Sequence, residues 1–206
     1  MTASSLSFAE SERRELADLL ERVGADAPTC CAGWETAHLV AHLVAREHRP
    51  DTLPGYGADV ALGGGPLAAW SHRVEDRLRA SSTYAELVGR LRAGPPAWSP
   101  LSWPSVARRL NTTEFAIHHE DVRRARAGWS PRALPRDAQD ALWNAASLFA
   151  RSAAGRRGLV LRRSDLAGAE KRYGAGGRTV VGEPLELLLW ASGRRDHARV
   201  EVFQPG

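Results

Sequence analysis

The chain has 206 residues, of which 43% are apolar and 25% are charged, fractions typical of a globular protein with one or two domains. Of its 28 basic residues only Lys171 is a lysine, a bias typical of GC-rich genomes, and 24 acidic residues reduce the formal net charge to +4. No segment resembles a signal peptide or reaches the ~20 apolar residues of a membrane span, so we expect a cytoplasmic protein.

Residues 1–154 carry helical patterns. Ser7 and Glu10 form a capping box that begins an amphipathic helix, and Gly24 ends it. A second capping box, Thr83 with Glu86, begins a short helix that ends near residue 94. The remaining helices are predicted over residues 34–47, 66–79, 105–127 and 136–154, and residues 51–65 are predicted to be irregular because of their glycines and proline.

The pattern changes after residue 155. Residues 158–162, 178–181 and 198–203 have β character, residues 174–177 form a glycine-rich turn, and residues 183–192 have the pattern of a short helix. We therefore predict a mainly α protein, with a helical domain over residues 1–154 and a small α/β domain over residues 155–206.

The strongest chemical signal is the pair Glu114 and His118. Four residues separate them, so on a helix both side chains project from one face within a turn of each other. A carboxylate and an imidazole at this spacing can share a divalent ion, as helical ligands do in bundle metal sites. The alternative is an ordinary surface pair at helical spacing.

His42 is the third candidate ligand, because it lies inside an apolar stretch of the second helix. Alone, such a histidine is more often a satisfied core residue. Together with Glu114 and His118 it completes a three-ligand set with open coordination positions, which is the arrangement of catalytic zinc. His38, four residues earlier, either adds a fourth ligand or only flanks the site.

The residues around His118 have different predicted roles. Asp121 shares the face of His118 and is expected to orient its imidazole, whereas His119 and Glu120 are expected to face elsewhere. Arg123, Arg124 and Arg126 end the helix, where cations interact favourably with the helix dipole; without interleaved aromatic residues, they indicate a solvated face rather than a nucleic-acid site.

Two further motifs carry little chemistry. Cys30 and Cys31 are adjacent, so they lack the spacing of a redox pair or of a four-cysteine zinc site, and we expect ordinary reduced thiols. The turn at residues 174–177 precedes a strand instead of linking a strand to a helix, which argues against a nucleotide-binding loop.

Several stretches together resemble a known family, the mycothiol-dependent maleylpyruvate isomerase group of the DinB/YfiT-like metal-binding superfamily. The resemblance covers nearly the whole chain. Its motifs are Asp26-Ala-Pro-Thr-Cys-Cys-Ala-Gly-Trp34, Ala41-His-Leu-Val-Ala-Arg-Glu47, Arg49-Pro-Asp51, Gly94-Pro-Pro96, the stretch from Asn111 through Glu114 and His118 to Arg124, Gly128-Trp129 and Gly182-Glu-Pro-Leu-Glu-Leu-Leu-Leu189.

The resemblance implies an N-terminal four-helix bundle in which a divalent metal, usually zinc, is held by His42, Glu114 and His118. The position of His38 is more often acidic in the family pattern, which is a departure of this chain. The isomerase also uses an arginine of its C-terminal domain, and Arg194 or Arg195 could serve as that catalytic residue.

The expected function is therefore a metal-dependent enzyme that uses a low-molecular-weight thiol, such as mycothiol, for isomerisation or S-transfer on a small electrophile. A metal-coordinated thiol is deprotonated at neutral pH, which produces the nucleophile. Two alternatives stay open: a metal-dependent hydrolase at the same triad, and a non-catalytic protein that binds the metal or a small molecule. We expect no nucleic-acid or membrane partner, and a homodimer is left open.

Overall fold

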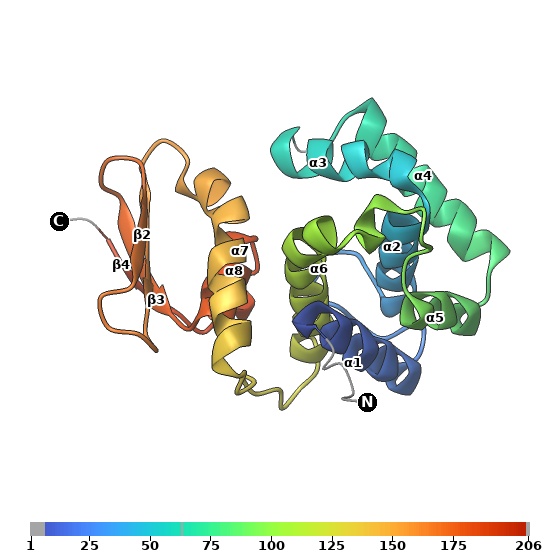
Figure 1. Cartoon of the computed structure of the whole chain (residues 1–206), viewed down its shortest axis with the longest axis horizontal. Coiled ribbons are helices and arrows are strands. Elements are labelled where there is room, and N and C mark those ends of the chain that lie inside the picture. The colour runs from blue at the N-terminus through green and yellow to red at the C-terminus, as the bar shows by residue number, and fades with distance from the viewer. Residues whose placement is uncertain (1–6, 63, 205–206) are drawn as a thin grey trace. The chain divides into compact units, whose positions relative to one another are not determined.

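The computed structural model describes residues 7–62 and 64–204, which divide into two compact units (Figure 1). Residues up to Trp129 form the helical unit, and residues from Ser130 form the C-terminal unit. The described chain is mainly helical and contains one four-stranded sheet, in agreement with the predicted fold class. None of the described helices is long and apolar enough to span a membrane.

The described residues of the helical unit form six α-helices, with 3₁₀ turns at Pro50–Thr52 and Pro100–Ser102. The helices are α1 (Phe8–Val23), α2 (Thr36–His48), α3 (Leu53–Leu62), α4 (Pro66–Ser81), α5 (Tyr84–Ala93) and α6 (Pro104–Arg124). Both predicted capping boxes are confirmed, because Ser7 with Glu10 begins α1 and Thr83 with Glu86 begins α5.

The apolar core of the helical unit comes from the inner faces of α1, α2, α5 and α6. Leu16, Leu39, Leu91 and Phe115, one from each of these helices, have no exposed surface. Helix α1 contacts α5 and α6, and α2 contacts α4 and α5. The periodic apolar positions in the sequence are therefore the buried ones, as amphipathic helices require.

The prediction that residues 51–65 are irregular is wrong, because α3 covers most of them. A proline and two glycines give this segment a poor intrinsic helix propensity, and tertiary packing overrides it. A Cβ on Gly55 would lie 2.3 Å from the Leu67 carbonyl oxygen of α4, so the glycine permits a close backbone approach. The Ser71 hydroxyl also donates to the Thr52 carbonyl oxygen (2.9 Å).

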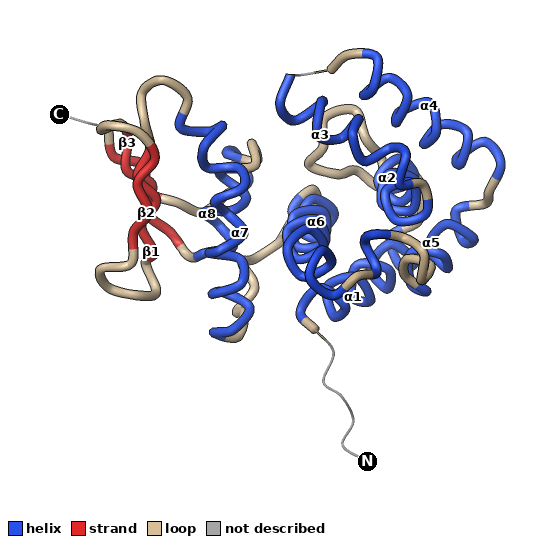
Figure 2. Tube along the Cα trace, turned by 45° about the horizontal axis from the view of Figure 1, so that its top comes forward, coloured by secondary structure: helices blue, strands red, loops and turns tan. Residues whose placement is uncertain are grey.

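The C-terminal unit is a four-stranded sheet with two helices on one face (Figure 2). Its elements are α7 (Arg136–Ala154), β1 (Leu159–Arg163), β2 (Glu170–Tyr173), β3 (Arg178–Gly182), α8 (Pro184–Ala191), a 3₁₀ turn at Arg195–His197 and β4 (Glu201–Phe203). The strand order is β2-β1-β3-β4, in which β1 and β3 are parallel and the outer pairs are antiparallel. Strand β2 had no counterpart in the sequence prediction, because this edge strand is polar.

Helix α7 packs on the sheet and on α8, although the predicted domain boundary at residue 154 assigned it to the helical domain. Lys171 of β2 donates to the Trp143 carbonyl oxygen (2.8 Å), and the Tyr173 hydroxyl donates to Ser147 Oγ (2.9 Å). Gln139 Nε2 donates to Glu183 at the start of α8 (3.0 Å). The apolar face of α7 therefore covers the sheet, which explains why an amphipathic helix begins the second unit.

Candidate metal centre

The structure brings His42, Glu114 and His118 together at the junction of α2 and α6. Their ligand atoms all lie within 4.8 Å of one another. Glu114 Oε1 is 2.9 Å from His42 Nε2 and 3.4 Å from His118 Nε2. Both imidazoles are buried, and their ring centroids are 5.3 Å apart. One imidazole nitrogen of each histidine and a carboxylate oxygen thus converge on one point, which is the donor set of a divalent transition metal.

Each of the two histidines contacts a second carboxylate through its other ring nitrogen, Nδ1. Glu75 Oε1, on α4, is 2.9 Å from His42 Nδ1, and Asp121 Oδ2 is 2.9 Å from His118 Nδ1. Each Nδ1 is therefore occupied, and each Nε2 is directed at Glu114. Metal-bound histidines almost always have such a partner, because it fixes the tautomer and the ring orientation. The role predicted for Asp121 agrees with this geometry, whereas Glu75 was missed.

Glu114 is held from its other side by Arg46. Arg46 Nε lies 3.5 Å from Glu114 Oε2, and its NH1 donates to Asn111 Oδ1 (2.8 Å). Asn111 Nδ2 in turn donates to the Leu101 carbonyl oxygen (3.1 Å). Arg46, positioned by its hydrogen bond to Asn111, forms this ion pair with Oε2, so Oε1 of Glu114 stays directed at the two histidines.

The electrostatics of the triad favour a negative glutamate and positive histidines in the metal-free protein. Burial lowers the pKa of His42, but hydrogen bonds to Glu114 and Glu75 outweigh it and raise the pKa above its ordinary value. Burial also lowers the pKa of His118, but hydrogen bonds to Asp121, Cys31 and Glu114 outweigh it and raise the pKa well above its ordinary value. Burial raises the pKa of Glu114, but Arg46 and the two histidines hold it well below its ordinary value. A metal would therefore displace protons from the imidazoles.

Two aromatic side chains pack against His42. The Trp34 ring lies 5.3 Å from the imidazole, and the Tyr56 ring, carried by α3, lies 4.6 Å away in an edge-on orientation. The hydroxyl oxygen of Tyr56 is buried. Burial, followed by the nearby charge of Glu75, raises the pKa of this phenol far above its ordinary value.

His38 and His119 do not join the triad. His38 Nδ1 accepts a hydrogen bond from the Glu35 backbone N–H (3.3 Å) at the start of α2, and His38 is not one of the described residues that group with the triad. His119 Nδ1 is 3.1 Å from Glu12 of α1, on the other side of α6, and Glu120 is bonded to Arg123 and Arg124. Both residues after His118 therefore face elsewhere, as their rotation around the helix predicts.

Cys31 lies next to the triad, although sequence reasoning assigned it no role. Its thiol donates to Asp121 Oδ2 (3.1 Å), and its sulfur is 4.0 Å from His118 Nδ1. The Cys30 backbone N–H bonds the Asp121 carbonyl oxygen (2.9 Å), which ties this loop to the end of α6. Within the part of the chain that the structure describes, neither Cys30 nor Cys31 forms a disulfide bond.

The prediction of a solvated arginine face at the end of α6 is wrong for Arg124. This side chain is buried, with the residue only 3% exposed, because it pairs with the buried Glu120 and stacks over the Trp129 ring at 4.4 Å. A buried carboxylate requires such a partner.

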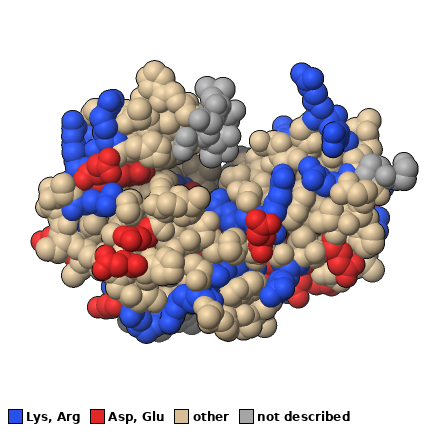
Figure 3. Space-filling model, turned by 180° about the vertical axis from the view of Figure 1, so that it is seen from behind, with Lys and Arg blue, Asp and Glu red and all other residues tan. Residues whose placement is uncertain are grey.

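Arginine and acidic side chains are interspersed on the face seen in Figure 3.

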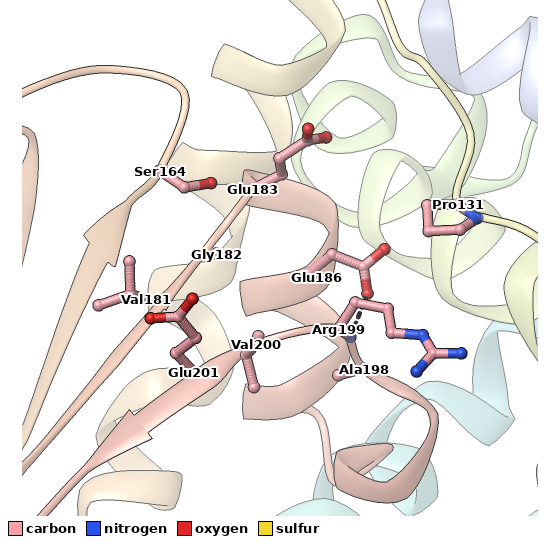
Figure 4. A pocket seen from close by; sticks show the side chains of 10 residues that line it. All are labelled: Pro131, Ser164, Val181, Gly182, Glu183, Glu186, Ala198, Arg199, Val200 and Glu201. Carbon is pink, nitrogen blue, oxygen red and sulfur yellow. Dashed lines mark hydrogen bonds between the residues drawn. The ribbon is translucent and has the colours of Figure 1, made fainter.

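Arg194 and Arg195 lie beside α8 in the C-terminal unit. Arg195 stacks on the Trp190 ring (4.8 Å), as Arg178 does (5.2 Å), and Arg194 NH1 donates to the Ser192 carbonyl oxygen (3.0 Å). Neither Arg194 nor Arg195 lines the cavity of about 530 Å³ in this unit. That cavity is lined by the end of β3, by Glu183 and Glu186 around the start of α8, and by residues 198–201, which lead into β4. The Glu186 carboxylate there accepts a hydrogen bond from the Arg199 backbone N–H (2.7 Å; Figure 4).

Comparison with known proteins gives similarity of structure only. No family model and no curated protein matches the sequence. Two crystal structures of a mycothiol-dependent maleylpyruvate isomerase are similar, each over 96% of this chain and 92% of that one. A histidine-to-alanine mutant of the isomerase has a TM-score of 0.56 at 17% identity. The second structure has a TM-score of 0.52 at 18% identity. The chain therefore has the fold of the mycothiol-dependent maleylpyruvate isomerase over nearly its whole length.

Proposed function

We propose that this chain is a metal-dependent enzyme, with zinc held by His42, Glu114 and His118, that uses a low-molecular-weight thiol such as mycothiol. The reaction would be an isomerisation or S-transfer on a small electrophile. The observation that carries the proposal is the pairing of each histidine Nδ1 with a carboxylate while both Nε2 atoms approach Glu114. The shared fold with a mycothiol-dependent isomerase supports the choice of reaction.

A bound divalent cation would supply a Lewis acid that lowers the pKa of a thiol and stabilises its thiolate. The chain's own residues do the positioning. Glu75 and Asp121 hold the two imidazoles, and Arg46 holds Glu114. The rings of Trp34 and Tyr56 pack on His42 and shield it from water.

The shared fold does not assign a role to any arginine of the C-terminal unit, so that role is a separate proposal. Arg194 or Arg195 would bind a carboxylate of the substrate, because the planar guanidinium matches that group in two hydrogen bonds. A glutamine variant of the residue responsible should raise KM more than it lowers kcat, which steady-state kinetics would measure.

The first experiment compares His118→Ala with His38→Ala. His118 is a proposed ligand, whereas His38 is a histidine outside the group, so only His118→Ala should lose bound zinc, measured by elemental analysis, and thiol-dependent turnover. Circular dichroism shows whether each variant is folded. A folded His118→Ala protein with full metal and full activity would refute the site. Turnover that does not require a thiol would favour the metal-dependent hydrolase instead.

A further inference from the structure

A second group of side chains able to bind a metal ion lies on the Nδ1 side of His118, whereas the triad uses Nε2. Its members are Cys31, His118 and Asp121, whose ligand atoms all lie within 4.8 Å of one another. Cys31 Sγ is 3.1 Å from Asp121 Oδ2 and 4.0 Å from His118 Nδ1, and Oδ2 is 2.9 Å from Nδ1. In a tetrahedral zinc site, the bond lengths to sulfur, nitrogen and oxygen place neighbouring ligand atoms about 3.3–3.6 Å apart. The three separations bracket these values, so small side-chain movements would fit the three atoms around one cation.

The loop that carries Cys31 is held against α6, so its sulfur has a defined place. The Cys30 backbone N–H donates to the Asp121 carbonyl oxygen (2.9 Å). The Cys31 backbone N–H donates to Thr29 Oγ1 (3.1 Å). Asp121 and His118 are buried and Cys31 is half-buried. The three donor atoms are thus positioned before any cation arrives, which reduces the entropy lost on binding.

The sulfur distinguishes this group from the triad, which offers two imidazoles and a carboxylate. Thiolate is a soft ligand and selects thiophilic cations. We propose that Cys31, Asp121 and His118 Nδ1 form a second metal position that takes soft divalent cations such as Cd²⁺. The cation replaces the thiol proton of Cys31 and the Nδ1 proton of His118, and both protons go to the solvent.

The two positions share His118 and therefore compete for its ring, a consequence that rests on the proposed function. A neutral imidazole carries one proton and has one nitrogen left to bind a cation. A cation on Nδ1 keeps that proton on Nε2, which faces Glu114 Oε1 at 3.4 Å. The ring then donates to Glu114 instead of binding metal beside it. Soft cations at Cys31 should thus remove zinc from the triad.

Titration of the metal-free protein with Cd²⁺ tests the position directly, because a sulfur–cadmium bond produces an ultraviolet charge-transfer band. The wild type should develop this band, and Cys31→Ser should not. The matched control is Cys30→Ser, which removes the neighbouring thiol of the same loop and should keep the band. Glu114→Gln weakens only the triad, so it should give the band at the same Cd²⁺ concentration or a lower one. Circular dichroism shows whether each variant is folded, and Cys31→Ala provides a second removal of the sulfur.

Equilibrium dialysis of zinc-loaded proteins against Cd²⁺, followed by elemental analysis, tests the competition. Half-release of zinc should need at least about tenfold more Cd²⁺ in Cys31→Ser than in the wild type or Cys30→Ser. Equal release from all three proteins would overturn the competition. A wild type without the band, a band that survives in folded Cys31→Ser, or a band lost equally in Cys30→Ser would overturn the metal position. A wild type that gives the band but takes up no zinc would leave the position standing and overturn the proposed function instead.

Discussion

Replacing Glu75 with glutamine removes one negative charge behind His42 and leaves the shape of the side chain nearly unchanged. Glu75 is 6% exposed, and its Oε1 lies 2.9 Å from His42 Nδ1. The amide oxygen of glutamine can still accept the Nδ1–H bond, so the imidazole orientation should survive. What is lost is the charge that makes the imidazole a stronger ligand and stabilises its Nδ1–H tautomer.

The expected loss of metal affinity follows from this role. Removal of such a carboxylate partner typically weakens metal binding by about 10–100-fold, which corresponds to about 1.4–2.8 kcal/mol. We expect the lower end for Glu75→Gln, because the hydrogen bond is kept. Glu75→Ala should reach the upper end, because it removes the bond as well as the charge.

The assay is a competition titration of zinc against a chromophoric chelator, with Asp76→Asn as the control. Asp76 is the next residue of α4, but its side chain is 70% exposed and pairs with Arg79, so its zinc dissociation constant should equal that of the wild type. If Glu75→Gln binds zinc as tightly as the wild type and Asp76→Asn do, Glu75 does not support the ligand, and the inference from its distance to His42 is refuted.

Three further predictions concern pH, metal removal and packing. The pKa values of His42 and His118 are raised in the folded protein, so these histidines stabilise the metal-free protein below about pH 6.5, and this stabilisation is lost as the pH rises through their folded pKa values. Urea unfolding at a series of pH values should show this loss. An unfolding free energy that keeps rising over the same pH range would contradict the prediction. The lowered pKa of Glu114 stabilises the protein above about pH 4.5, and the same titration should show the loss as the pH falls through the folded value. Adding a chelator to zinc-loaded protein should lower the unfolding free energy by about 4 kcal/mol when free zinc was a thousandfold above its dissociation constant; an unchanged Tm would count against a metal site. Gly55→Ala should lower the free energy of unfolding by about 1–3 kcal/mol, because the new Cβ would lie 2.3 Å from the Leu67 carbonyl oxygen. The control is Gly57→Ala, whose new Cβ would meet no atom within 4 Å, so its free energy of unfolding in the same denaturation experiment should be unchanged or slightly higher.

The sequence alone identified what depends on spacing within one helix. The two capping boxes locate the starts of α1 and α5, because each involves only residues three apart. The relation of Glu114 and His118, and the orientation of His118 by Asp121, follow from the α-helical repeat. Arg46 lies four residues after His42, so the same helical spacing predicts that both side chains project from one face of α2.

Tertiary structure decided every contact between segments distant in the chain. Glu75, Tyr56 and Cys31 come from α4, α3 and a loop, and no local pattern indicates that they meet His42 or His118. The same limit explains α3, whose glycines and proline oppose a helix until α4 packs against Gly55. Local spacing determines which side chains of one helix act together, because backbone geometry is fixed there. The remaining partners depend on how the helices pack, since only packing brings a second carboxylate or an aromatic ring from another helix to a histidine.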